Sequence, residues 1–199
     1  MPSSVEAYVF DLGNVIVDIH IENFLPALGL DGKWSVEEAL SKYERSGLSN
    51  EFELGNISFD EFHDRSCELF GIRIDKETFL EGWNAIIGEE KPGMYDIIDA
   101  CSKQAPVYLL SNTNDPHYKD ALTKAPSLRL LKEHYLSYEL NLLKPDPRIY
   151  TETAGRIGLP PERLFFTDDR EDNIASAREV GLQAVRFEST QQLKSILRL

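Results

Sequence analysis

Short apolar segments alternate with longer stretches of helical spacing along this chain, and no other feature constrains its fold as strongly. The helical stretches include one apolar i, i+3, i+4, i+7 face, made by Met94, Ile97, Ile98 and Cys101. The apolar segments are too short for buried helices and are rich in Val, Leu, Phe and Tyr, so we expect strands at Ala7–Phe10, Val107–Leu110, weakly around Tyr135–Tyr138, Leu164–Thr167 and Ala184–Phe187. Strands that alternate with helices predict parallel β–α–β units, and therefore an α/β fold with a helix-covered parallel sheet.

The stretch from about Ile19 to Lys91 interrupts this alternation with helical patterns and no convincing strand. Two helix starts in it have capping-box form, Ser35 with Glu38 and Ser58 with Glu61. We therefore expect a core made of residues 1–18 and 92–199, with a helical cap, residues 19–91, inserted after the first strand. The hydrophobic core of that cap is expected to contain Tyr43, Trp83 and the aromatic face of Phe59–Phe70.

Charge and composition exclude several classes of protein. The 199 residues carry 34 Asp and Glu against 21 Lys and Arg, a formal charge of −13, which argues against non-specific binding of nucleic acid or of an anionic membrane. With 42% hydrophobic residues the chain is not intrinsically disordered. No basic leader and no apolar run of about 20 residues is visible, so we expect a cytoplasmic protein. Ordinary solvated surface is expected for much of the acidity, such as Glu51, Glu53, Glu89 and Glu90.

The two cysteines, Cys67 and Cys101, have neither CxxC spacing nor a nearby pair of histidines. Buried free thiols are therefore expected rather than a disulfide or a zinc site. His63 and His134 have no partner spacing and are interpreted as surface or partly buried residues without a functional role. His20 and His117 lie closer to the expected site, but neither is expected to act on a substrate.

Polar side chains follow the expected strands at the points where they end. Asp11 comes directly after the first strand, Ser111 begins the run Ser-Asn-Thr after the second, and Asp168 and Asp169 follow the strand at 164–167. Lys144 lies in a loop before another helix. The carboxyl ends of parallel strands meet at one edge of a sheet, where open α/β folds bind ligands. We therefore expect these groups to converge on one pocket.

The chemistry of that set can be derived from the residue types. Clustered carboxylates repel one another unless a cation intervenes, and hard oxygen ligands favour Mg²⁺. Ser111 and the backbone N–H groups after it, just before a helix, suit a phosphate. Lys144 adds a compact positive charge. A carboxylate beside Mg²⁺ can then attack phosphorus and form an aspartyl-phosphate, which water hydrolyses.

Four motifs in this order, FDLGNV, LLSNT, LLKP and FFTDDREDN, resemble the haloacid dehalogenase superfamily of hydrolases. The resemblance covers nearly the whole chain and includes a helical cap placed directly after the first strand. In detail, FDLGNVIVD, LSNTN and KPDPRIY are similar to a bacterial branch of sugar-phosphatases that includes α-D-glucose-1-phosphate phosphatases. The resemblance implies a Rossmann-like parallel sheet with an inserted α-helical cap. It also implies a Mg²⁺-dependent phosphatase that acts on a small phosphorylated metabolite, most naturally a sugar phosphate.

The resemblance also assigns roles by position. Asp11 is expected as the nucleophile and a magnesium ligand, and Lys144 as the lysine that bridges charges between the phosphate and Asp11. Ser111 and the Asn112 amide are expected to hold the phosphate. Further roles are a metal ligand at Asp169, a backbone-carbonyl metal ligand at Gly13, and support of the acidic loop by Asp168 and Asn173.

Gly13 departs from the common pattern, since most family phosphatases carry Asp two residues after the nucleophile as general acid and base. Loss of such a group costs about 10²–10⁴ in rate. Asp18 and His20 are candidate substitutes, although nothing in the sequence places them at the site. The departure leaves an alternative open, a catalytically weak protein that binds or regulates. A phospho-acceptor signalling domain and a haloacid dehalogenase fit less well, because the acidic pair comes late, the insert is large, and a Mg²⁺ site suits phosphate.

Overall fold

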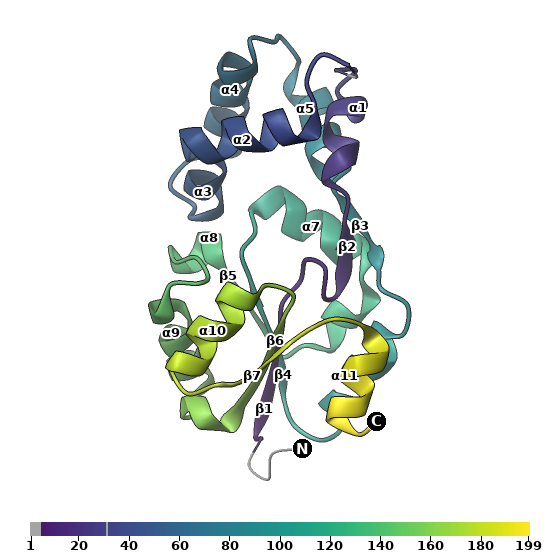
Figure 1. The fold of residues 1–199 in the computed structure, drawn as a ribbon, viewed down its shortest axis with the longest axis vertical. Helices are drawn as coiled ribbons and strands as arrows, with labels where there is room; N and C mark the ends of the chain where they lie inside the picture. The colour runs from purple at the N-terminus through teal and green to yellow at the C-terminus, as the bar shows by residue number, and fades with distance from the viewer. Residues whose placement is uncertain (1–4, 31) are drawn as a thin grey trace.

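The computed structural model describes residues 5–30 and 32–199, and a parallel sheet lies at its centre (Figure 1). The strands run in the order β5-β4-β1-β6-β7, with every neighbouring pair parallel. Their bounds are β1 Ala7–Phe10, β4 Val107–Ser111, β5 Glu133–Leu136, β6 Leu164–Asp168 and β7 Gln183–Arg186. The expected α/β fold is confirmed, and the weak segment near Tyr135 begins two residues earlier than expected.

Helices cover both faces of this sheet because side chains of a strand alternate between faces. Tyr8 and Phe10 of β1 pack with the apolar residues of α6 and α11, whereas Ala7 and Val9 pack with those of α9 and α10. The helices of this part of the chain are α6 Met94–Ser102, α7 Asp115–Lys124, α8 Ser137–Leu140, α9 Pro147–Ile157, α10 Glu171–Glu179 and α11 Thr190–Leu197, with 3₁₀ segments at Pro126–Leu130 and Pro161–Arg163.

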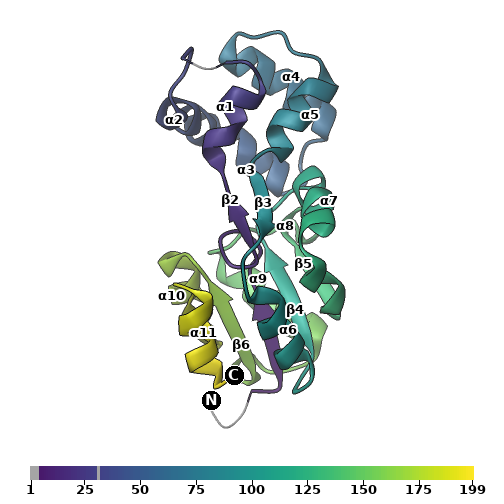
Figure 2. The same cartoon turned by 90° about the vertical axis from the view of Figure 1, so that its right-hand side faces the viewer.

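A second group of helices forms the inserted cap and packs around its own aromatic cluster (Figures 1 and 2). The expected Tyr43 and Trp83 both belong to this cluster, and Phe52 and Phe62 stack with ring centroids 4.3 Å apart. The capping box at the start of α2 is complete, with both hydrogen bonds between Ser35 and Glu38. The elements are a 3₁₀ turn Ile21–Asn23, α1 Phe24–Ala27, α2 Val36–Ser46, α3 Leu48–Glu53, α4 Phe59–Phe70 and α5 Lys76–Asn84.

A two-stranded antiparallel ribbon joins the cap to the sheet, seen as the narrow waist of the molecule in Figure 2. It pairs β2, Val17–Ile19, with β3, Ile87–Glu90. The expectation of no strand between residues 19 and 91 was therefore wrong, and the expected boundary at residues 18–19 falls inside β2. Both strands are very short and their partners lie about 70 residues apart in the chain, so no local pattern reveals them.

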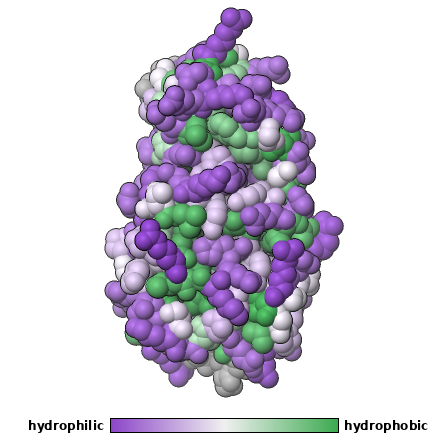
Figure 3. All heavy atoms as spheres, turned by 180° about the vertical axis from the view of Figure 1, so that it is seen from behind, coloured by the Kyte–Doolittle hydropathy of each residue, from purple (hydrophilic) through white to green (hydrophobic). Residues whose placement is uncertain are grey.

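The surface matches the acidic, polar composition. Hydrophilic side chains cover most of the face shown in Figure 3, with hydrophobic ones dispersed among them. Among the described residues, none of the helices combines the length and apolar character needed to cross a bilayer. Cys67 and Cys101 are free thiols, as expected, but only Cys101 is buried, whereas the expected burial of Cys67 is wrong because this residue is partly exposed.

Candidate active site

Lys144 lies at the centre of the polar groups that the strand ends bring together. Its Nζ is 2.7 Å from Oδ1 of Asp11 and 2.6 Å from Oδ2 of Asp168, and it donates to the carbonyl of Leu110 at 3.0 Å. Asp11 follows β1 and Asp168 ends β6, which is the neighbour of β1 in the sheet. All three charged side chains are buried. The structure thus places the expected nucleophile and the expected lysine in direct contact.

Asp168 is fully occupied by hydrogen bonds. Besides Lys144, it accepts from the Asn173 side chain at 2.9 and 3.0 Å and from the backbone N–H of Arg170 at 2.9 Å. Its exposed fraction is 0%, so these donors replace water completely. Asp168 therefore fixes the lysine in place, and Asn173 fixes Asp168.

Asn112 clamps the backbone of Lys144 on both sides of the residue. Its Oδ1 accepts from the Lys144 N–H at 2.8 Å, and its Nδ2 donates to the Lys144 carbonyl at 2.9 Å. The side-chain amide is thereby engaged, so the amide that can face a phosphate is the backbone N–H. The next N–H, of Thr113, donates to Oγ of Ser137 at 2.9 Å. Ser111 ends β4 and is among the residues that line the pocket.

Carboxylates outnumber cations at the buried centre. Oxygens of Asp11, Asp168 and Asp169 lie within 4.8 Å of one another, and Lys144 is the buried ammonium that faces the first two. Burial raises the pKa of Asp11 to about 7, against the lowering effect of Lys144. Burial and the charge of Asp168 also raise the pKa of Asp169. Both carboxylates would thus be stabilised in the ionised form by a further cation.

The donor set fits Mg²⁺. Asp169 is half-buried and oriented by Nδ2 of Asn14 at 3.2 Å, and its carbonyl accepts from Nε of Arg186 at 3.0 Å. Since Asp168 is occupied, the available oxygens are those of Asp11 and Asp169, which are hard ligands. Gly13 lines the pocket beside Asp11. A Cβ at Gly13 would lie 3.2 Å from Cγ1 of Ile19, so β2 leaves little room for a side chain there.

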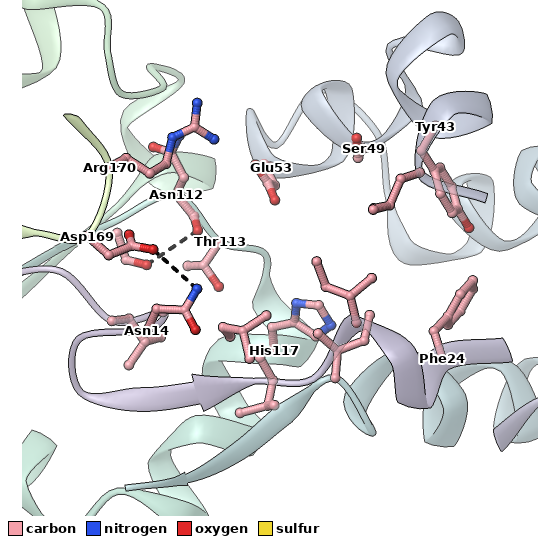
Figure 4. A pocket seen from close by; sticks show the side chains of 18 of the residues that line it. Asn14, Phe24, Tyr43, Ser49, Glu53, Asn112, Thr113, His117, Asp169 and Arg170 are labelled. Atoms are coloured by element: carbon pink, nitrogen blue, oxygen red, sulfur yellow. Dashed lines mark hydrogen bonds between the residues drawn. The ribbon is translucent and has the colours of Figure 1, made fainter. Parts of the chain in front are cut away.

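The site opens into a cavity of about 420 Å³ between the sheet edge and the cap (Figure 4). The polar floor comes from the loops described above, and Figure 4 shows Asn112, Thr113 and Asp169 on that side. The cap contributes mainly apolar side chains, together with Ser49 and Glu53. The apolar wall consists of Ile21, Phe24, Leu25, Val36, Ala39, Leu40, Tyr43, Trp83 and Ile86.

Glu53 was expected to be ordinary solvated surface, and that expectation was wrong. It is the last residue of α3 and lines the pocket, and Figure 4 shows its side chain extending from the cap into the cavity. Burial raises the pKa of Glu53 to about 7, although Lys144 and Arg170 act to lower it. Nothing in the sequence around Glu53 distinguishes it from Glu51. Only the tertiary structure shows that Glu53 lines the pocket and that Glu51 does not.

Asp18 and His20, the candidate substitutes for a general acid, do not line the pocket. Asp18 lies on β2 between Val17 and Ile19, so it points to the opposite face, where it forms an ion pair with Lys91. His20 lies beside Glu22 with Nδ1 3.2 Å from the carboxylate, and its side chain is 44% exposed. Both are engaged away from Asp11.

The remaining histidines have structural surroundings. His117 lines the pocket, but its Nε2 lies 2.8 Å from the carbonyl of Trp83 and its ring stacks on that indole at 4.6 Å. The indole N–H donates to Asn114, the N-cap of α7, so this contact joins α5 of the cap to the core. The other two bond to backbone carbonyls, His63 to Ile74 and His134 to Leu128. His134 is partly buried as expected, whereas His63 is buried.

Comparison with known proteins agrees with this geometry. A family model described as haloacid dehalogenase-like hydrolase matches residues 5–181. A D-ribitol-5-phosphate phosphatase of Bacteroides thetaiotaomicron is 30% identical over 193 residues, which cover 93% of each chain. A solved structure of a haloacid dehalogenase family enzyme from the same organism superposes with a TM-score of 0.89 at 27% identity, covering 99% of this chain and 100% of that one.

Another solved structure of a family enzyme from that organism holds magnesium and inorganic phosphate. It superposes with a TM-score of 0.83 at 27% identity over 92% of this chain and 94% of the other. The match extends over core and cap together, so the inserted cap belongs to the shared fold. The chain therefore belongs to the haloacid dehalogenase-like hydrolases, and its relatives place it among the phosphatases of that family.

Proposed function

We propose that the protein is a Mg²⁺-dependent phosphatase of a small phosphorylated metabolite, of the sugar phosphate class, and that it works through an aspartyl-phosphate on Asp11. The observation that carries the proposal is the Asp11–Lys144–Asp168 triplet, buried beside Ser111 at the edge of the pocket. The phosphatases of ribitol 5-phosphate and of phosphorylated carbohydrates among the relatives support the substrate class.

Each residue has a role that follows from its surroundings. Ser111 and the Asn112 N–H hold the phosphate oxygens, and Lys144 neutralises charge between the phosphate and Asp11. A carboxylate oxygen of Asp11 attacks phosphorus as the bond to the leaving oxygen breaks, and water later breaks the Asp11–phosphate bond. Asp168 and Asn173 hold Lys144 in register for both steps.

Magnesium has a place in this proposal through Asp11, Asp169 and the Gly13 carbonyl, and the related enzyme complex with magnesium and phosphate supports it. When bound, it supplies positive charge to the phosphate and keeps Asp11 ionised. Residues 19–91 act as the cap, which excludes water and selects the leaving group.

The test is hydrolysis of a panel of phosphorylated metabolites, measured with Mg²⁺ for the wild type, Asp11→Asn and Asp18→Asn. Asp18 is the matched control, because its carboxylate pairs with Lys91 outside the pocket. We expect turnover by the wild type and by Asp18→Asn, and a loss of about 10⁴-fold or more in Asp11→Asn. No turnover across the panel, or equal turnover by Asp11→Asn, would reject the proposal in favour of a protein that binds without catalysis.

A further inference from the structure

Proton transfer in this site requires a group other than the residue at position 13. The leaving oxygen needs a proton when its bond to phosphorus breaks, and the water that attacks later must lose one. Gly13 has no proton to give, and Asp18 and His20 are engaged outside the pocket. The donor must therefore be sought among the protonatable side chains that do line the cavity.

Most of those side chains are already engaged. Asp11 and Lys144 are paired, and Asp169 belongs to the acidic centre. The ring of His117 is held by Trp83 and Asn114, and burial lowers its pKa to about 4. The Tyr43 hydroxyl bonds to Ser66 at 3.1 Å inside the cap core.

Glu53 is different, because its carboxyl group forms no hydrogen bond or ion pair with any of the residues that the structure describes. It lines the cavity from the cap, and Figure 4 shows its side chain extending from α3 toward the space between the cap and the loops that carry Asn112 and Arg170. A leaving group bound in the cavity lies between the phosphate site and the cap. Glu53 therefore lines the part of the cavity in which the leaving group would be bound.

The backbone around Glu53 is fixed to the core, so its position does not depend on the cap alone. Oγ of Ser137 lies 2.6 Å from the Glu53 carbonyl and accepts from the Thr113 N–H of the phosphate loop. Nδ2 of Asn141 donates to the carbonyl of Leu54 at 2.8 Å. The Ser137 hydroxyl thus links the backbone of Glu53 to the loop that begins at Ser111.

We propose that Glu53 is the general acid and base of this enzyme, supplied by the cap in place of the group absent at Gly13. This inference rests on the phosphatase function proposed above. In the first step the Glu53 carboxyl proton moves to the leaving oxygen as Asp11 takes the phosphoryl group, and an alcohol leaves. In the second step the Glu53 carboxylate takes a proton from water, the water oxygen bonds to phosphorus, and the bond to Asp11 breaks, which releases phosphate and restores both residues.

The electrostatic surroundings suit both steps. Burial brings the pKa of Glu53 to about 7, where an acid and its conjugate base are both accessible near neutral pH. The charged groups that act on it are Lys144, from the loop before α9, and Arg170, at the start of α10. Both limit the rise in pKa, so the carboxylate form stays available to activate water.

The test compares Glu53→Gln with Glu51→Gln, whose carboxylate pairs with Arg65 at 2.6 Å and does not line the pocket. For an alkyl phosphate, whose leaving group needs a proton, we expect Glu53→Gln to lower kcat/KM by about 10²–10⁴-fold. For p-nitrophenyl phosphate, whose leaving group needs none, the first step should slow by less than about tenfold. Because the second step still lacks its base, a burst of p-nitrophenol equal to the enzyme concentration should precede slow turnover.

Two further readouts separate proton transfer from a structural role. In the wild type, kcat/KM for the alkyl phosphate should fall as pH rises above about 7, because Glu53 loses the proton that it donates. The pH profile of Glu53→Gln should not show this decrease. Glu53→Asp keeps a carboxyl group and should restore part of the alkyl phosphate activity. Thermal melting of each variant verifies folding independently.

The outcomes distinguish this inference from the function on which it rests. An inactive wild type rejects the phosphatase itself. An active wild type that depends on Asp11, together with equal losses for both substrates in Glu53→Gln, overturns the role of Glu53 alone. If Glu53→Gln had a higher KM, an unchanged kcat and no burst, Glu53 would only bind substrate, and its proposed role in proton transfer would also be overturned.

Discussion

Lys144 shows how one residue organises this site. A buried ammonium is stable only when carboxylates and a carbonyl surround it, and here Asp11, Asp168 and Leu110 do so. Burial opposes the charged form of Lys144, but the two carboxylates outweigh it and raise the pKa of the lysine. The same contacts that stabilise the lysine therefore also hold Asp11 in place.

His117 gives a pH dependence of stability at the residue scale. Burial lowers its pKa to about 4 in the folded protein, against an ordinary value near 6.5, so the unfolded chain binds a proton first as pH falls. The stability that the neutral, buried His117 contributes is fully present above pH 6.5 and decreases as the pH falls. At pH 5 this effect has lowered the free energy of unfolding by about 2 kcal/mol. We expect urea unfolding between pH 7 and pH 5 to show a smaller loss in His117→Gln than in the wild type.

That comparison has an internal control. The pKa of His134 is also lowered by burial, but His134 is present in both proteins and its effect cancels in the difference. Equal losses of unfolding free energy in the wild type and the variant would show that the His117 ring is not buried in the neutral form.

At the scale of elements, the contact between α3 and α8 is one of the places where the cap packs on the core. Gly55, two residues after Glu53, has φ of +71°, and a Cβ there would lie 2.3 Å from the carbonyl oxygen of Tyr138. Gly71, directly after α4, also has a positive φ, +62°, but a Cβ added there would have no neighbouring atom within 4 Å. The two glycines thus share a backbone conformation but differ in their contact with the core.

Gly71→Ala should cost about 1–2 kcal/mol of unfolding free energy from the left-handed backbone alone. Gly55→Ala should cost about 1–3 kcal/mol more, because the added methyl group forces α3 away from α8. It should also lower kcat, since Glu53 moves with α3, whereas Gly71→Ala should leave kcat unchanged. Unfolding in urea and steady-state kinetics measure the two effects, and equal losses in both variants would contradict the docking role.

The elements also show which features a sequence can predict. Asp11 follows β1, Ser111 and Asp168 are the last residues of β4 and β6, and Lys144 lies in the loop before α9. The geometry of a parallel sheet brings such strand ends together. Glu53 escaped prediction because its place depends on how α3 docks on a helix more than 80 residues away in the chain. The ribbon of β2 and β3 escaped for the same reason.

At the scale of the whole molecule, the formal charge of −13 repels anionic substrates unless a cation intervenes. A metal that binds only the folded protein raises its melting temperature by mass action. At about 100 times its Kd, Mg²⁺ should raise the Tm by about 5–10 °C. Asp169→Asn should remove most of this shift in a thermal melt.

Asp172→Asn is the matched control, because Asp172 is close in sequence but pairs with Arg170 at the exposed start of α10. It should keep the wild-type shift with Mg²⁺. A full shift in Asp169→Asn would mean that magnesium stabilises the protein at some other place.

The position of β1 in the sheet has a consequence for synthesis. Tyr8 pairs with Val107 on one side and with Phe165 on the other, so β1 leaves the ribosome long before either neighbour exists. At about 5–20 residues per second, roughly 5–20 s pass between Tyr8 and Val107, the first of its partners to be made. During that interval the cap can complete its local contacts, while an apolar strand with two open edges has no partner. The strand that precedes Asp11 therefore exposes unpaired edges to aggregation while the chain is being made.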